Sequence, residues 1–277
     1  MTFIENKTLD REREFYGSDG VCLKNCSFDG EADGESAFKE SKNVSVEGCL
    51  WNLRYPFWHD ERVVIKDTHL TEKCRAALWY SKNIKVEGSR LHGIKALREC
   101  ADVLITGTSV DSTEFGWSTE RVKMTDSTAR GEYFMLRARD LYFEGFELNG
   151  KYSFQYVENA VFENCTLNTK DAFWHAKNIT VKNSTVNGEY LAWYSENITF
   201  ENCKISGTQP LCYCKGLRLI NCEMIGADLS FEKSEVEATL TAPIDSIKNA
   251  ARGHVRVPAV GEIIKDDPNA ECVIEII

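Results

Sequence analysis

The sequence lacks the features that would place the protein in a membrane or on nucleic acid. No apolar run approaches the roughly 18 residues of a membrane-spanning helix, and the segment from Met1 to Asp10 does not resemble a secretory signal. Basic residues are the minority, with 33 Lys and Arg against 43 Asp and Glu, so the net charge of -10 disfavours a polyanionic partner. We therefore expect a cytoplasmic protein with neither a membrane nor a nucleic acid as its partner.

Common signatures of catalysis and metal binding are also missing. The chain has no nucleophile elbow, phosphate-binding loop, dinucleotide fingerprint or H-E-x-x-H motif. Its 11 cysteines are odd in number and spread from Cys22 to Cys272 without C-x-x-C pairs, which argues against a disulfide framework. The lone C-x-C of Cys212 and Cys214 is too small for a zinc site. We expect no metal and no cofactor.

The sequence does contain a repeat of 19 residues. The segments that begin at Ile179, Ile198 and Leu217 share the pattern apolar, any, apolar, any, Asn, small. When this register is extended both ways, only the first and third steps are longer than 19 residues. The turns of the repeat begin at Val21, Val44, Val63, Ile84, Val103, Val122, Leu141, Ala160, Ile179, Ile198, Leu217 and Val236.

Residues at equal places in successive turns share one chemistry, where position zero is the first residue of each turn. Positions zero and two are apolar throughout, which indicates a β-strand with alternating inward side chains. Position four is mostly Asn or Gly, which tolerate the left-handed backbone of a sharp corner. Position five is Ser, Thr or Cys in all but one turn, so we interpret its cysteines as core residues with weak S–H donors. The equivalent Asn178 and Asn197 are expected to form a side-chain hydrogen-bond ladder.

A 19-residue unit with short strands and sharp corners is too short for a propeller blade, and it shows no helical periodicity. The repeat therefore predicts an all-β fold, a single-stranded parallel β-helix (solenoid) of about 12 turns stacked roughly 4.8 Å apart. We expect a single domain over residues 1–277. It would have an N-terminal cap at 1–20, the repeat at 21–242, and distorted turns with a cap at 243–277.

The last part of each turn carries the candidate binding residues. Positions eleven and fifteen are polar or aromatic, and alternation along a strand would put them outside and the tryptophans of position fourteen inside. Lys39, Arg98 and Gln155 share position fourteen, and burying them unpaired would be costly, so its orientation stays open. The predicted ligand-binding residues are Tyr133, Tyr152, Tyr156, Tyr190, Trp193 and Tyr194.

Position thirteen is apolar, although alternation would turn it outward. Three explanations stay open: a bulge that turns these side chains inward, a subunit interface or tail that covers them, or an aromatic platform for a ligand. The residues concerned are Phe38, Phe57, Leu78, Leu97, Met135, Phe154, Phe173 and Leu211.

Another set of residues points to catalysis. Arg137, Asp171, His175 and Glu189 come from the same part of neighbouring turns and combine a cation, an acid and a candidate base. They could act on one substrate only if their side chains converge in one cleft.

Several motifs resemble those of a known bacterial family. They include Gly34-Glu-Ser-Ala-Phe-Lys-Glu-Ser-Lys-Asn43, Lys170-Asp-Ala-Phe-Trp174 and Gly188-Glu-Tyr-Leu-Ala-Trp193 on the 19-residue ladder. The family is the uncharacterised domain of unknown function 3737, which is similar to the pectin-lyase-like right-handed β-helices. The resemblance implies a right-handed solenoid and carries no established activity. Pectin-lyase-like enzymes mostly act on polysaccharides, but their aspartate clusters and calcium site are not recognisable in this sequence.

Three hypotheses for function follow. The first is that a carbohydrate or a related small polar ligand binds the aromatic outer face. The second is a non-enzymatic scaffold that pairs with a partner, or with itself as a homo-oligomer, through position thirteen. The third is a polysaccharide lyase or a glycoside hydrolase.

Overall fold

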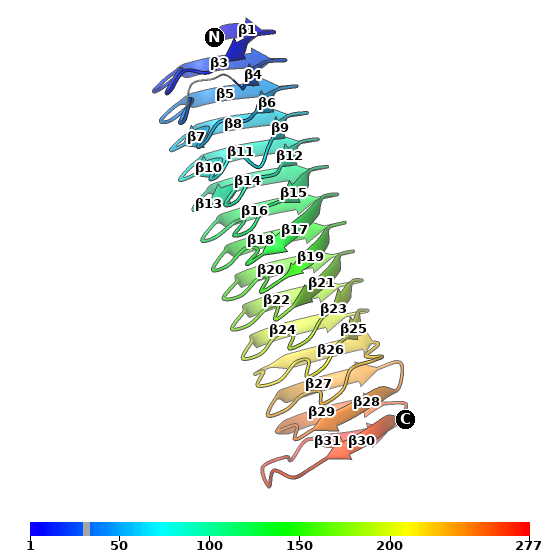
Figure 1. Cartoon of the computed structure of the whole chain (residues 1–277). Coiled ribbons are helices and arrows are strands. Elements are labelled where there is room, and N and C mark those ends of the chain that lie inside the picture. Colours follow the sequence, from blue (N-terminus) through cyan, green and yellow to red (C-terminus); the bar gives the residue numbers. More distant parts are fainter. Residues whose placement is uncertain (30–33) are drawn as a thin grey trace. The chain divides into compact units, whose positions relative to one another are not determined.

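The computed structural model describes residues 1–29 and 34–277, and these ranges contain strands and turns but no helix. The chain divides between Tyr142 and Phe143 into two compact units, residues 1–142 and 143–277, which are described separately. In each unit, parallel strands stack turn upon turn in chain order (Figure 1). No helix of membrane-spanning length and apolarity occurs in the two described ranges.

Residues 1–142 form three parallel sheets. The first contains β1 (Thr2–Glu5), β3 (Asp19–Lys24), β5 (Lys42–Glu47), β8 (Glu61–Lys66), β11 (Lys82–Glu87), β14 (Ala101–Thr106) and β16 (Glu120–Thr125). The second contains β2 (Thr8–Leu9), β4 (Ser27–Phe28), β6 (Leu50–Trp51), β9 (His69–Leu70), β12 (Arg90–Leu91), β15 (Ser109–Asp111) and β17 (Thr128–Glu132). The third is short and contains β7 (Phe57–Trp58), β10 (Leu78–Trp79) and β13 (Leu97–Arg98). The division of the chain falls within β18 (Arg139–Glu144).

Residues 143–277 repeat the arrangement with two long sheets and one short one. The first contains β20 (Glu158–Glu163), β22 (Lys177–Lys182), β24 (Glu196–Glu201), β26 (Leu217–Cys222), β27 (Glu235–Leu240), β29 (Arg252–Val257) and β31 (Val273–Ile276). The second contains β19 (Glu147–Lys151), β21 (Thr166–Lys170), β23 (Thr185–Asn187) and β25 (Lys204–Ser206). Near the C-terminus, β28 (Ile244–Lys248) pairs with β30 (Val260–Ile264).

These sheets confirm the predicted right-handed parallel β-helix, with about 14 turns of about 19 residues in the described ranges. Partners in neighbouring strands lie 19 residues apart where the repeat is regular, as Val44 and Val63 do. The predicted cap at residues 1–20 is itself a turn of the repeat, because Thr2 pairs with Val21. In this turn Thr2 stands where later turns have an apolar residue, and Phe3 is exposed.

The corner between the first and second strands has the predicted left-handed backbone. Position four has a positive φ near 50° to 60° in the regular turns, and Asn, Gly or Asp occupies it because their backbones reach this region at low cost. The residues are Asn25, Gly48, Asp67, Gly88, Gly107, Asp126, Gly145, Asn164, Asn183, Asn202 and Asn221.

Position five confirms the structural interpretation of its cysteines. In several turns this side chain accepts a hydrogen bond from the backbone N–H of the preceding turn, as Cys49 does from Cys26 at 3.4 Å and Ser184 from Cys165 at 2.9 Å. It also donates to a carbonyl two residues earlier, as the Cys203 thiol does to Glu201 O at 3.3 Å. Burial raises the pKa of the Cys49 thiol to about 11, and all 11 cysteines are free. These thiols therefore hold neighbouring turns together.

The predicted asparagine ladder is present on the first sheet. Asn178 donates its side-chain amide to Asn159 Oδ1 at 3.0 Å, and Asn197 donates to Asn178 Oδ1 at 3.2 Å. A parallel stack of identical amides can satisfy donor and acceptor in this way at every turn.

One buried carboxyl group departs from the pattern around it. Asp60 is 1% exposed, in a column where the neighbouring turns have Ser41 and Ser81. Its Oδ1 accepts from Ser41 N at 2.9 Å, while its buried Oδ2 has no hydrogen-bond partner among the described residues. Burial raises the pKa of Asp60 to about 8, against the effect of the Ser41 N–H. The folded protein therefore keeps this carboxyl protonated at neutral pH.

We predict that Asp60→Ser stabilises the protein more as the pH rises. Between the unfolded-state pKa of 3.8 and about 8, the folded carboxyl holds a proton that the unfolded chain releases, so the wild-type stability falls with pH. The slope is at most about 1.4 kcal/mol per pH unit. Urea unfolding of both proteins at pH 5 and pH 8 measures the difference, and a stability gain that is equal at the two pH values would contradict the prediction.

Candidate functional site

The last part of each turn does not follow strand alternation. Positions eleven and fifteen have a positive φ, and in residues 143–277 position thirteen does too, as Asp171, Phe173 and His175 show at 54°, 60° and 55°. In three turns of residues 1–142, position thirteen instead begins the short strands β7, β10 and β13. In both arrangements the side chains of positions twelve and thirteen are buried, and that of position fifteen lies on the outer surface. The apolar stripe is therefore internal: Phe38, Phe57, Leu78, Leu97, Met135, Phe154, Phe173 and Leu211 are all fully buried. The first of the three explanations for position thirteen holds, and the stripe is not an exposed interface.

Position fourteen, whose orientation the sequence left open, has its tryptophans half-buried on the outer surface. The indole N–H groups of Trp174 and Trp193 donate to the position-eleven carbonyls of the next turn, Tyr190 O at 2.6 Å and Gln209 O at 2.8 Å. The side-chain amide of Gln155 makes the same bond to Asp171 O at 3.0 Å. At these three turns a side-chain N–H donor bonds to the next turn, whether a tryptophan or a glutamine supplies it.

Position fifteen forms a ladder of stacked rings in residues 143–277, here called the aromatic ladder: Tyr156, His175, Tyr194 and Tyr213. Its ring centroids are 4.9, 5.1 and 4.8 Å apart in that order, with planes within 12° of parallel. Tyr156 and Tyr194 are 47% and 45% exposed. The ladder places three phenol groups and one imidazole in a row on the outer surface.

The spacing of the aromatic ladder decides how it can meet a ligand. Parallel rings about 5 Å apart leave no room for a sugar ring between them, so a ligand would meet the ladder from the outside. What faces the solvent is mainly ring edges, with hydroxyl groups and imidazole nitrogens. Ring edges carry partial positive charge and phenols donate and accept hydrogen bonds, so this surface suits ligands with many oxygen atoms.

The other predicted binding residues lie beside the aromatic ladder or apart from it. Trp193 is in edge contact with Tyr190 and Tyr213, with ring centroids 5.3 Å away in both cases. Tyr152 lies against the Lys151 ammonium at 5.4 Å. Tyr133 belongs to residues 1–142, where its carbonyl accepts from the Trp117 indole at 2.7 Å. Sequence reasoning left Tyr213 and Trp174 out of the binding set, although both occupy ring-bearing positions of the 19-residue repeat.

The predicted catalytic residues are only partly brought together. Asp171 is 6% exposed, and burial, with a smaller effect of Glu189, raises its pKa although Lys170 opposes the shift. Glu189 accepts a hydrogen bond from Lys170 Nζ at 2.9 Å. His175 makes its ring contacts with the tyrosines on either side of it in the aromatic ladder.

Arg137 is exposed and belongs to the other unit, residues 1–142. The catalytic roles of these four residues stay predictions. Among residues 1–29 and 34–277, no group of three or more His, Cys, Asp or Glu side chains could hold a metal ion.

These features define a β-solenoid with a ring-bearing outer face. The chain belongs to the family described as protein of unknown function (DUF3737), whose model matches residues 2–277. A comparison with curated proteins gave no match.

Solved structures similar to this chain include pentapeptide-repeat and β-helix proteins. HetL, a pentapeptide repeat protein involved in heterocyst differentiation regulation from the cyanobacterium Nostoc sp., is 12% identical, with 81% of this chain and 92% of that chain covered and a TM-score of 0.29. QnrB1, a plasmid-mediated fluoroquinolone resistance protein, is 14% identical over 66% and 83%, with a TM-score of 0.21. The catalytic domain of a GH87 α-1,3-glucanase is 9% identical over 99% and 58%, with a TM-score of 0.30. The likeness at these identities concerns the fold alone.

We predict that Trp174→Phe destabilises the protein by about 1 kcal/mol more than Trp79→Phe does, because only the first change removes a hydrogen bond. The Trp174 indole donates to Tyr190 O, whereas the Trp79 indole N–H is without an acceptor in the described part of the chain. Urea unfolding followed by circular dichroism gives the two differences. Equal losses for both variants would show that the indole bond contributes nothing.

Proposed function

We propose that the protein binds a carbohydrate, or another small ligand rich in hydroxyl groups, along the aromatic ladder of residues 143–277. The observation that carries this proposal is the row of parallel, partly exposed rings at a constant spacing near 5 Å. Nothing in the stacking of turns requires rings at position fifteen, since other turns have Glu99 or Arg137 there.

The ligand would form hydrogen bonds with the polar groups at the edges of these rings. Four successive turns each contribute one polar group to this line. Tyr156, Tyr194 and Tyr213 contribute hydroxyl groups, and His175, between the first two, contributes its imidazole. A ligand with several hydroxyl groups in a row can pair with such a line of donors and acceptors, because each member serves as either. The rings need not move, since their neighbours hold them by stacking, and a preorganised surface loses little entropy on binding.

The surroundings of the aromatic ladder support a neutral polar ligand. Lys170 and Glu189, from the same turns as His175 and Tyr194, neutralise each other through their 2.9 Å hydrogen bond. The Tyr213 hydroxyl lies near Glu232, and burial, followed by this carboxylate, raises the pKa of Tyr213. The raised pKa keeps the Tyr213 hydroxyl a neutral hydrogen-bonding group at physiological pH.

A hydroxyl-deleted variant tests the proposal. We expect the triple change Tyr156→Phe, Tyr194→Phe and Tyr213→Phe to keep the ring stack but to weaken binding at least about tenfold, because three hydroxyl contacts of roughly 0.5–1.5 kcal/mol each are lost. A glycan array identifies the ligand, and isothermal titration calorimetry with that ligand measures the affinities.

The matched control is Tyr80→Phe. Tyr80 is also an exposed position-fifteen tyrosine, stacked on His59 at 4.9 Å, but it lies in residues 1–142 and outside the aromatic ladder. It should bind as the wild type does. An array without any bound glycan, or a triple variant with unchanged affinity, would refute the proposal.

A further inference from the structure

The regular repeat of residues 1–142 is lengthened at two steps, from Val21 to Val44 and from Val63 to Ile84, and the second of these contains a longer connection between strands. Seven residues, 71–77, join β9 to β10, whereas five residues join β6 to β7 and five join β12 to β13. The two additional residues make the step from Val63 to Ile84 21 residues long. Glu72 and Lys73, at the outer end of this longer connection, are exposed.

The longer connection is firmly held. The Thr71 hydroxyl donates to Asn52 Oδ1 at 2.7 Å, and the buried Cys74 thiol donates to Trp51 O at 2.8 Å and to Leu53 O at 3.2 Å. On the other side Gly93 packs so closely that a Cβ there would lie 2.9 Å from Cys74 O. The insertion is therefore a fixed part of the surface, pinned to the turns before and after it.

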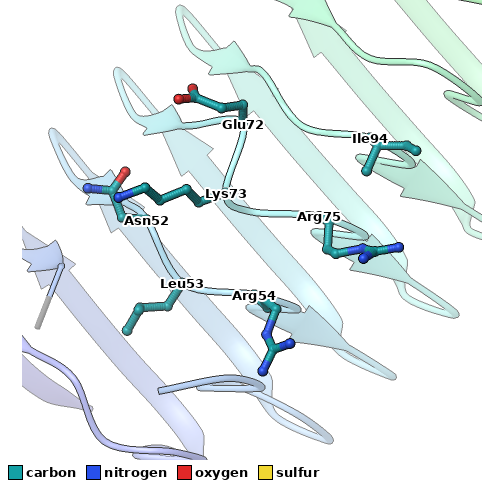
Figure 2. A pocket seen from close by; sticks show the side chains of 7 residues that line it. All are labelled: Asn52, Leu53, Arg54, Glu72, Lys73, Arg75 and Ile94. Atoms are coloured by element: carbon teal, nitrogen blue, oxygen red, sulfur yellow. The ribbon is translucent and has the colours of Figure 1, made fainter. Parts of the chain in front are cut away.

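A hollow of about 540 Å³ lies along this insertion (Figure 2). Figure 2 shows Lys73 reaching back toward Asn52, while Arg54 and Arg75 extend from neighbouring turns on the other side of the connections. The lining residues are Asn52, Leu53, Arg54, Glu72, Lys73, Arg75 and Ile94. Three of them are cations and one is an anion.

This charge arrangement differs from the rest of the surface. Elsewhere neighbouring turns place opposite charges side by side, as in Lys204 with Glu223 at 3.4 Å and Lys182 with Glu201 at 3.7 Å. Of the three cations around the hollow, Arg54 pairs with Glu35 at 3.3 Å, whereas Lys73 and Arg75, which lie on the same connection, form no ion pair within the described ranges. Two neighbouring cations without a counter-charge repel each other, so an anion between them would be stabilising.

We propose that this hollow binds a small organic anion through a carboxylate or phosphate group. The planar guanidinium of Arg75 can hold two oxygens of such a group at once, and the Lys73 ammonium adds a compact charge. The side-chain amide of Asn52 offers a neutral polar contact, and Leu53 and Ile94 form an apolar wall for the carbon part of the ligand. The hollow belongs to residues 1–142 and the aromatic ladder to residues 143–277, so the anion site can be tested independently of the proposed function.

Calorimetric titration of the full chain at low ionic strength tests the site, with inorganic phosphate, glucuronate and glucose as probes. We expect phosphate or glucuronate to bind and glucose not to bind here, with an affinity that falls as salt is added. Binding of phosphate alone identifies a phosphate site, and binding of glucuronate alone identifies a carboxylate site. The double change Lys73→Gln and Arg75→Gln should weaken the binding at least about tenfold.

A second variant keeps the test independent of folding damage. Glu72→Gln removes the carboxylate among the described lining residues and should strengthen anion binding severalfold. Arg130→Gln, an exposed arginine on β17 away from the hollow, is the matched control and should change nothing. The proposal is overturned if neither anion binds, if the control weakens binding as much as the double variant does, or if Glu72→Gln weakens it.

Discussion

The hydrogen bonds between successive turns set every other feature of this protein. Because the strands pair in parallel and in register, each residue of a regular turn lies against the residues 19 places before and after it, roughly 4.8 Å away. Each side chain must therefore pack against, or bond with, the side chains at the same position of the two neighbouring turns. Apolar columns, amide ladders, hydroxyl and thiol columns, alternating charges and stacked rings are the solutions to that one requirement, and Lys177 opposite Glu196 at 3.6 Å is a typical instance.

The outer face depends on a second constraint, the left-handed residues of the last part of each turn. A left-handed conformation costs a residue with a side chain about 1–2 kcal/mol, and burying a phenylalanine returns about 1.5–3 kcal/mol. Phe154 and Phe173 are both left-handed and fully buried, so the burial of each ring offsets the cost of its backbone conformation. The same backbone exposes carbonyl groups that the Trp174 and Trp193 indoles then satisfy. The ring-bearing face is thus a consequence of how the core is closed on this side.

The fold could be predicted from the sequence because its columns are visible as a period. Position two, the corner at position four and the hydrogen-bonding column at position five all follow from local chemistry repeated every 19 residues. The orientation of positions thirteen and fourteen could not be predicted, because strand alternation fails where φ changes sign at every second residue, as at Phe173. The aromatic ladder was found in part, since Tyr156 and Tyr194 stand out by spacing. The hollow at Lys73 was missed, although its signal, two additional residues after Val63, is present in the register.

The buried thiols allow local opening of the turns to be followed by chemical modification. Ten of the 11 cysteines are buried, and burial raises the pKa of several thiols, so alkylating reagents meet few thiolates while the turns stay closed. Each turn is held mainly by its neighbours, so a turn that opens locally exposes its own thiol. Cys26 and Cys49 lie in one unit, whereas Cys165 and Cys203 lie in the other. The sulfurs that become reactive thus identify the turns that have opened.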